Sequence, residues 1–138
     1  MSTDLKGKGN KDRSRLFRSF SYAFQGVKYV ITTEKNMKIH LFVTVIVVIL
    51  GMVLSLSPIE WLFILFAIGG VLSLEMINTA IERTIDLVTK DYHLLAKRAK
   101  DVAAGAVLIY AILAVIVGMI IFGPKLYHIF VTNVIKIN

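Results

Sequence analysis

Three long apolar stretches constrain the fold of this chain more than any other feature of its sequence. They cover residues 39–56, 61–74 and 102–122, and the second continues in a mixed pattern as far as residue 88. A helix needs about 20 residues to cross the ~30 Å hydrocarbon core of a bilayer. Each stretch reaches that length together with its flanks or its continuation, so the sequence predicts an all-α integral membrane protein with three transmembrane helices.

Helix-breaking residues set the predicted boundaries of these spans. Ser57-Pro58 separates the first span from the second, because proline cannot continue a helix but suits the first turn of the next one. Gly123-Pro124 is expected to end the third span, and residues 123–138 then form an apolar tail to which we assign no function. Gly69-Gly70 lies in mid-span and predicts a close helix–helix contact. The predicted spans cover about residues 37–56, 59–88 and 101–122.

The composition supports this class and excludes several others. Hydrophobic residues make up 57% and charged residues 18% of the 138 residues, whereas soluble domains contain about 45–50% apolar and about 25% charged residues. Intrinsic disorder needs low hydrophobicity, and a disulfide-stapled module needs cysteine, of which there is none. A large multi-domain enzyme does not fit into this length.

The segment before the first span divides into two parts. Residues 1–14 are rich in lysine and glycine and lack an apolar core, so we expect a disordered basic tail and no signal peptide. Over residues 15–33 the apolar residues share one helical face, which predicts an amphipathic helix at the membrane surface. A helix packed on a soluble partner is the alternative. The apolar residues of this face are Leu16, Phe20, Phe24, Val27 and Ile31.

Lysine and arginine are distributed unevenly along the chain. They are dense before the first span and between the second and third, and they are absent from the turn at residues 57–60. By the positive-inside rule, this pattern places the N-terminus and the second loop in the cytoplasm. The net charge of +7 is then explained by orientation and by attraction to anionic lipid, so no nucleic-acid partner is expected.

A row of polar residues lies in the second span. Glu75, Asn78, Glu82 and Asp86 are three, four and four residues apart, which places them on one helical face. A carboxylate at the depth expected for Glu75 costs about 2.5 kcal/mol or more, and such a residue is usually functional. A surface helix whose charges face water is the structural alternative, and it explains Glu75 and Asn78 poorly.

Cations follow this row, immediately before the third span. Lys97, Arg98 and Lys100 could form a salt-bridge network with the carboxylates. Alternatively, the carboxylates hold a divalent cation and the cations hold phosphates, the arrangement that phosphoryl transfer needs. The sequence contains neither a P-loop nor a protein-kinase catalytic loop. Its histidines show no zinc-ligand spacing, and cysteine is absent.

Residues 75–86, with the sequence EMINTAIERTID, resemble the signature motif of the prokaryotic diacylglycerol kinase family. Residues 91–93 and 97–101 resemble the loop that follows this motif in the family. Phe20, Ala23 and Gly26 resemble its surface helix. The resemblance covers roughly residues 15–122, and a motif of this length in the expected helix is highly specific.

The resemblance implies a homotrimer of three-span subunits, each with a surface helix, in the bacterial plasma membrane. It also implies transfer of the ATP γ-phosphate to the hydroxyl of a lipid alcohol, with Mg²⁺ carried on ATP. In the family's pattern Glu75 is the general base and Asn78 orients the base and the acceptor. Glu34 and Glu82 correspond to the metal ligands. The family's nucleotide contacts correspond to Arg15, Tyr22, Gly26, Asp91, Tyr92, His93, Lys100 and Asp101.

The family has two branches, which phosphorylate diacylglycerol or, typically in Gram-positive bacteria, undecaprenol for cell-wall carrier recycling. Residues 34–40 and the basic start of the chain are more similar to the second branch. Undecaprenol is therefore the predicted acceptor, and diacylglycerol is the alternative. From the residues alone, two other interpretations stay open: a non-catalytic membrane subunit whose carboxylates serve helix association, and a cation transporter with Glu75 as its ion site.

Overall fold

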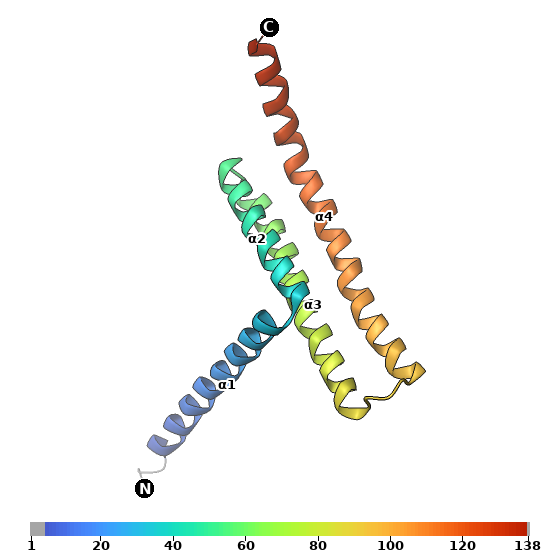
Figure 1. Ribbon diagram of the computed structural model, residues 1–138. Helices are drawn as coiled ribbons and strands as arrows, with labels where there is room; N and C mark the ends of the chain where they lie inside the picture. Colours follow the sequence, from blue (N-terminus) through green and yellow to red (C-terminus); the bar gives the residue numbers. More distant parts are fainter. Residues whose placement is uncertain (1–4, 138) are drawn as a thin grey trace. The chain divides into compact units, whose positions relative to one another are not determined.

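The chain forms four α-helices in the computed structural model (Figure 1). They are α1 (Leu5–Thr33), α2 (Lys35–Val53), α3 (Pro58–Val88) and α4 (Leu94–Ile137). The structure describes the backbone of residues 5–137 and the side chains of residues 15–133, and it contains no strand over these residues. The all-α prediction is therefore confirmed.

Three of the helices are long and apolar enough to cross a membrane. These are α2, α3 and the part of α4 up to Asn133, which confirms the three predicted spans. The chain divides into two compact units. The first contains α1 and ends at Glu34, and the second begins at Lys35 and contains α2, α3 and α4.

Two helix boundaries differ from the predicted ones. Helix α1 begins at Leu5, so residues 5–14, predicted to be a disordered tail, continue the helix of residues 15–33. They contain no proline that would end it. Residues 1–4 of the predicted tail lie outside the described residues. Helix α4 begins at Leu94 and continues through Pro124, where the sequence predicted its end.

Helix α4 passes through Pro124 beside an ion pair with α3. Proline removes one backbone N–H donor and costs roughly 3 kcal/mol in a helix interior. Directly after it, the Lys125 ammonium lies 3.2 Å from the Glu60 carboxylate. The same carboxylate accepts a hydrogen bond of 2.7 Å from the Ser57 N–H. These contacts fasten the proline turn of α4 to the beginning of α3.

The turn between α2 and α3 is tightly closed. Ser57 caps α3: its hydroxyl accepts a hydrogen bond from the Glu60 N–H (3.3 Å), which completes a capping box. Ser55 has a left-handed backbone conformation with φ 50°. Gly51 packs against the Trp61 indole, where a Cβ atom would come within 2.8 Å of the ring. The two helices therefore form a compact hairpin.

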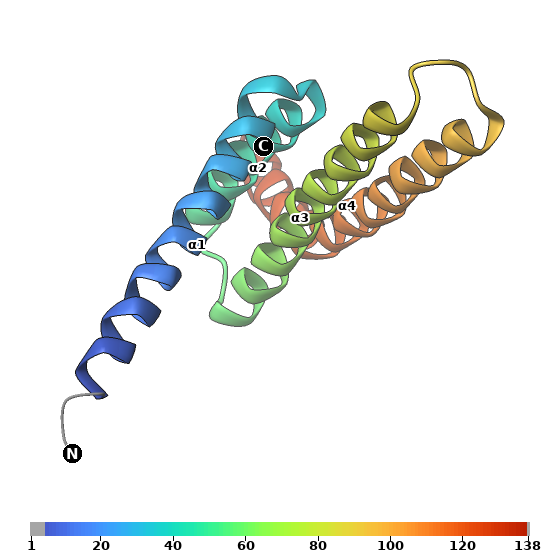
Figure 2. The same ribbon diagram turned by 90° about the horizontal axis from the view of Figure 1, so that it is seen from below.

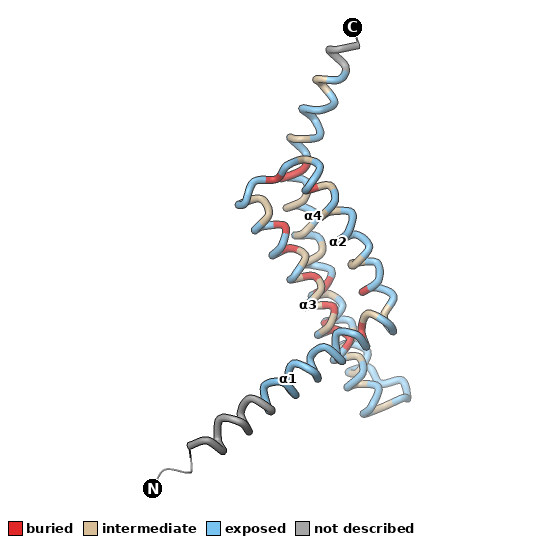
Figure 3. Tube along the Cα trace, turned by 90° about the vertical axis from the view of Figure 1, so that its left-hand side faces the viewer, coloured by how far each residue is buried: buried red, intermediate tan, exposed pale blue. Residues whose placement is uncertain are grey.

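Helices α3 and α4 lie side by side (Figures 1 and 2), and buried positions recur along α3 (Figure 3). Apolar packing is concentrated near the α2–α3 turn, where side chains of α2, α3 and α4 meet. Burial of a large aliphatic side chain against other side chains contributes through dispersion contacts in the dense interior. The buried residues of this cluster are Leu56, Ile64, Ile121 and Phe122.

A second contact joins α3 and α4 further along. The Tyr110 ring occupies the place where a Cβ atom on Gly70 would lie. The Tyr110 hydroxyl donates a hydrogen bond of 3.1 Å to the Phe66 carbonyl oxygen. The hydroxyl thereby gains a hydrogen-bond partner, which lipid chains could not provide. The close contact predicted for the glycine pair is therefore made at Gly70. Around the Cβ position of Gly69, by contrast, the described part of the chain places no side chain or other helix within 4 Å.

Candidate active site

The predicted polar row on α3 runs from the interior of the second unit to its surface. Glu75, Asn78 and Thr79 are 2%, 5% and 3% exposed. Glu82 is half-buried, and Asp86 is exposed. The helical spacing of three and four residues places these side chains along one face, so burial decreases steadily toward the C-terminal end of α3.

Hydrogen bonds within α3 leave one buried acceptor unused. The Thr79 hydroxyl donates to the Glu75 carbonyl oxygen (2.9 Å), and the Asn78 side-chain amide donates to Glu82 Oε1 (3.0 Å). Asn78 Oδ1 is buried and has no hydrogen-bond partner. An unsatisfied buried polar group costs about 1–3 kcal/mol. Its position beside Glu75 is consistent with an oxygen that accepts a hydrogen bond from a substrate.

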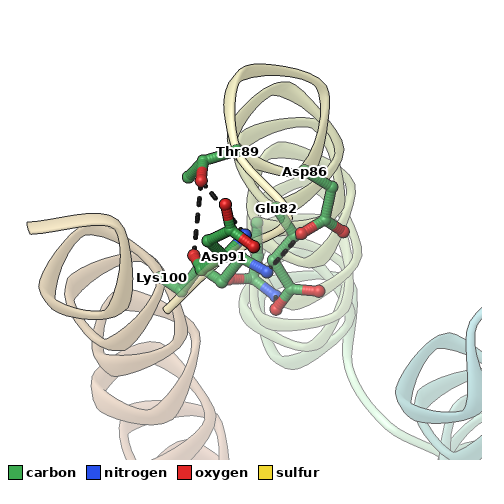
Figure 4. Close-up of polar contacts among 6 residues, drawn as sticks. Glu82, Asp86, Thr89, Asp91 and Lys100 are labelled. Carbon is green, nitrogen blue, oxygen red and sulfur yellow. Dashed lines mark hydrogen bonds and ion pairs between the residues drawn. The ribbon is translucent and has the colours of Figure 1, made fainter. Parts of the chain in front are cut away.

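Beyond Glu82 the row meets a cation of α4 (Figure 4). The Lys100 ammonium donates to the Asp86 carboxylate at 2.5 Å, while Lys97 donates to Asp101 at 2.7 Å within α4. The Lys100 and Asp86 side chains are 37% and 49% exposed, and ion pairs so exposed contribute only about 0–1 kcal/mol. Part of the predicted salt-bridge network is therefore present, as the pairs Lys100–Asp86 and Lys97–Asp101. A phosphate could displace the carboxylate of such an exposed pair with little loss of stability.

The loop between α3 and α4 is ordered by its own hydrogen bonds. The Thr89 hydroxyl accepts a hydrogen bond from the Asp91 N–H (3.2 Å) and donates one to the Asp91 carbonyl oxygen (3.3 Å), as Figure 4 shows. His93 Nδ1 accepts a hydrogen bond from the Leu95 N–H (3.3 Å) at the beginning of α4. These bonds join residues two apart, so they order the loop locally between the end of α3 and the beginning of α4.

A recess of about 490 Å³ lies between the end of α3, this loop and the beginning of α4. It brings together five of the residues predicted to contact the nucleotide, and it adds Asp86, Lys90 and Lys97 to its lining. Lysines and backbone groups at such a position suit a phosphate-bearing ligand. The five predicted residues are Asp91, Tyr92, His93, Lys100 and Asp101.

The other predicted nucleotide contacts lie on α1, in the first unit. Arg15 and Tyr22 are exposed, and so is Gly26, around whose Cβ position there is open space. Glu34, a predicted metal ligand, is the last residue of this unit and is half-buried. Its backbone N–H donates to the Val30 carbonyl oxygen (2.9 Å).

The donor set fits a divalent cation that arrives with a nucleotide. Among the residues that the structure describes, no three Asp, Glu or His side chains lie close enough together to hold a metal ion by themselves. Mg²⁺ in nucleotide sites uses one or two carboxylates, with phosphate oxygens and water completing its shell. The half-buried carboxylate of Glu82, one of whose oxygens is bound by the Asn78 amide, meets that requirement.

Two residues of this region were given no function of their own in the sequence prediction, which counted Thr79 only as a member of the polar face. Thr79 is buried and bonded to the backbone of Glu75, and Thr89 holds the loop. The four-residue spacing between Glu75 and Thr79 was the only signal for the first. No helical periodicity marks the second, because its bonds form after α3 has ended.

Comparison with known proteins gives matches over most of the chain. A family model described as prokaryotic diacylglycerol kinase matches residues 21–122. Undecaprenol kinase of Bacillus subtilis is 48% identical over 113 residues, which cover 82% of this chain and 92% of that protein. Diacylglycerol kinase of Synechocystis is 44% identical over 117 residues, which cover 84% of this chain and 67% of that protein. Diacylglycerol kinase of Escherichia coli is 28% identical over 103 residues, which cover 75% of this chain and 84% of that protein.

Proposed function

The chain belongs to the prokaryotic diacylglycerol kinase family, and we propose that it transfers the γ-phosphate of ATP to the hydroxyl of undecaprenol. The product, undecaprenyl phosphate, would serve the recycling of the lipid carrier of cell-wall synthesis. The observation that carries this choice of acceptor is the 48% identity to a protein named undecaprenol kinase, over 92% of that protein. The arrangement of α3 and α4 supports the reaction.

Glu75 is proposed as the general base. Its carboxylate lies in the buried part of the polar row, away from bulk water. Asn78, one turn further along the same face, is proposed to orient the base and the acceptor, and its side-chain amide holds the Glu82 carboxylate. A positioned base of this kind typically contributes 10²–10⁴-fold to a rate.

The transfer itself balances with these groups. The hydroxyl proton passes to the Glu75 carboxylate, and the alcohol oxygen forms a bond to the γ-phosphorus. The bond between the γ-phosphorus and the bridging oxygen breaks, and ADP leaves with the electron pair. Because phosphoryl transfer is accelerated mainly by positioning and charge neutralisation, the cations near the phosphates matter as much as the base.

The recess between α3 and α4 is proposed to hold the phosphates of ATP. Lys100 lines it and donates to Asp86 at 2.5 Å, in a pair that phosphate can replace. Asp101 and residues 91–93 line the same recess. From the resemblance to the family, Arg15, Tyr22 and Gly26 are proposed as further contacts. Glu34 and Glu82 would hold the Mg²⁺ that ATP carries, which supplies charge neutralisation when bound.

The assembly and orientation are proposed on the same basis. We propose a homotrimer in the bacterial plasma membrane, with α1 on the membrane surface and the N-terminus in the cytoplasm. The dense lysines and arginines before α2 and between α3 and α4 support this orientation. It places the recess on the side where ATP is found.

Diacylglycerol is the second candidate acceptor. The Synechocystis relative, at 44% identity, is named diacylglycerol kinase, and both lipids present a hydroxyl on an apolar body. In that case the product is phosphatidic acid for phospholipid metabolism.

One experiment separates the two acceptors. Purified protein is incubated with labelled ATP and Mg²⁺, and undecaprenol or dioleoylglycerol is supplied in matched micelles. Strong transfer to undecaprenol with weak transfer to dioleoylglycerol is expected. The reverse result would make the protein a diacylglycerol kinase. Transfer to neither acceptor, by a folded protein that binds ATP, would overturn the choice of substrate.

A second experiment tests the shared metal ion. Glu34→Gln and Glu82→Gln are each expected to raise the Mg²⁺ concentration needed for half-maximal transfer. If both carboxylates serve one ion, the effects of the two substitutions should be less than additive in the double variant. Independent, additive effects would contradict a common ion. ATP affinity without Mg²⁺ serves as the control, because neither substitution should change it much.

A further inference from the structure

The last part of α4 extends beyond the region that the family model matches. The match ends at residue 122, whereas α4 continues to Ile137. A helix of 44 residues is about 66 Å long at ~1.5 Å per residue, more than twice the ~30 Å hydrocarbon core. The uncharged residues 102–124 alone suffice to cross that core. The segment that follows therefore lies outside it.

A polar cluster marks the level at which α4 leaves the hydrocarbon. Lys125 forms its ion pair with Glu60 at the beginning of α3. His128 lines a recess together with Lys125 and Ser55, beside the α2–α3 turn. Charged groups are costly in the centre of a bilayer and are found near its boundary. Residues after Lys125 therefore lie at or beyond the membrane surface.

Residues 125–137 have the pattern of an amphipathic helix. Among the residues whose side chains are described, polar ones stand at positions 125, 128, 132 and 133, and the first three, which are three and four residues apart, share one helical face. Most of the remaining positions are apolar. Tyr127 and Phe130 are 71% and 67% exposed. The apolar residues of this segment include Leu126, Tyr127, Ile129, Phe130, Val131 and Val134.

The two faces of this segment point in different directions. Lys125 and His128 line the recess beside the α2–α3 turn together with Ile129, whereas Tyr127 and Phe130, which are both exposed, do not line it. No acidic residue follows Asp101 in the sequence, so the charges of the segment are exclusively basic. Aromatic residues opposite a basic stripe are typical of helices that lie in a membrane interface and fit anionic headgroups.

The chain also contains a point at which this segment can turn onto the membrane. Pro124 lacks the N–H that would bond to the Ile120 carbonyl oxygen, and helices bend most readily at such positions. A bend away from the α2–α3 turn would lay the Tyr127 and Phe130 face on the surrounding lipid.

We propose that residues 125–137 dock onto a phospholipid surface on the side of the membrane opposite the nucleotide recess. Tyr127 and Phe130 insert at the boundary between headgroups and acyl chains, and the stripe of Lys125 and His128 faces the headgroups and water. This surface is separate from the proposed kinase reaction, because none of its residues belongs to the proposed catalytic or nucleotide-binding set.

Fluorescence quenching of the full chain in vesicles tests the proposal. In a Trp61→Phe background, Tyr127→Trp places an indole on the apolar face and His128→Trp places one on the polar stripe. The vesicles contain phosphatidylcholine and phosphatidylglycerol, with or without brominated acyl chains. Brominated lipid is expected to quench the indole at position 127 more strongly than that at position 128. Aqueous iodide is expected to show the opposite preference.

Two results would overturn the proposal. Strong iodide quenching at both positions, without quenching by brominated lipid, would mean that the segment stands in water. Protection of position 127 from both quenchers would mean that a second copy of the chain covers it. Helical content verifies that the variants fold, and Phe130→Trp is a second reporter on the same face. Because quenching requires no phosphate transfer, a failure here is distinct from a failure of the proposed function.

Discussion

Two buried parts of α3 use polar groups in opposite ways. Where Tyr110 of α4 contacts α3, its hydroxyl donates a hydrogen bond to the Phe66 carbonyl oxygen, and its ring fills the space beside Gly70. Further along, Asn78 Oδ1 is buried without a partner beside the buried Glu75. The first arrangement favours helix association. The second lowers the stability of the resting protein, and it occurs at the residues that we propose for catalysis.

Of the four substitutions, Glu75→Gln should lower the rate of phosphate transfer most, without affecting folding. An amide keeps the shape of the side chain but cannot accept the proton, so transfer from labelled ATP to lipid should fall by about 10²–10⁴-fold. The helical content and assembly of the variant should be unchanged. Glu60→Gln, at the other end of the same helix, is the matched control and should retain transfer. Loss of assembly in Glu75→Gln would instead favour a non-catalytic subunit.

Asn78→Leu should separate activity from stability. It removes the unsatisfied oxygen and the amide that holds Glu82, so transfer should fall by roughly tenfold or more, a loss of at least ~1.4 kcal/mol in transition-state stabilisation. The free energy of unfolding should change little, since losing the amide's hydrogen bond to Glu82 is offset by replacing a buried unpaired acceptor with an apolar group. Denaturation in micelles and the transfer assay measure the two effects. A large loss of stability would show that the oxygen is satisfied in the resting protein.

Gly70→Ala should show the reverse pattern. The added methyl group overlaps the Tyr110 ring, and overpacking of this kind costs about 1–3 kcal/mol. The adjacent Gly69→Ala is the matched control: it meets open space and should be neutral or slightly stabilising. Unfolding free energies in matched micelles measure both. Equal effects at the two glycines would argue against a close contact at this level of α3.

Tyr110→Phe should have the smallest effect of the four. It keeps the ring and removes one hydrogen bond to Phe66, so the free energy of unfolding should fall by about 0.5–1.5 kcal/mol. Phosphate transfer should continue at close to its original rate, because Tyr110 is not among the residues proposed for catalysis or for binding ATP. A drop in transfer similar to that of Asn78→Leu would mean that the two parts of α3 are not functionally distinct.

The sequence was sufficient to predict the membrane spans and the polar row, for related physical reasons. Apolar length reports the thickness of the bilayer, and a spacing of three and four residues reports a helical face. The burial of Glu75 and Asn78 agrees with that reading. These are properties of one helix at a time, and they need no knowledge of the neighbouring helix.

Features that depend on two helices were less accessible. Gly69 and Gly70 are equivalent as sequence, and only the position of Tyr110 on α4 distinguishes them. The pair of Lys100 and Asp86 joins two helices across a loop. The continuation of α4 through Pro124 contradicts a local preference, beside an ion pair to Glu60 that no local pattern encodes.

The tight α2–α3 turn has a consequence for biosynthesis. The chain between Lys38 and Glu60 contains no lysine, arginine or acidic residue, and the turn within it is closed by the Ser57 capping box and by the contact of Gly51 with Trp61. Two helices joined so closely can enter the bilayer together as a hairpin, with only a short uncharged turn to be carried across. In the orientation that we propose, the basic residues before α2 and after α3 stay in the cytoplasm and resist inversion of the inserted pair.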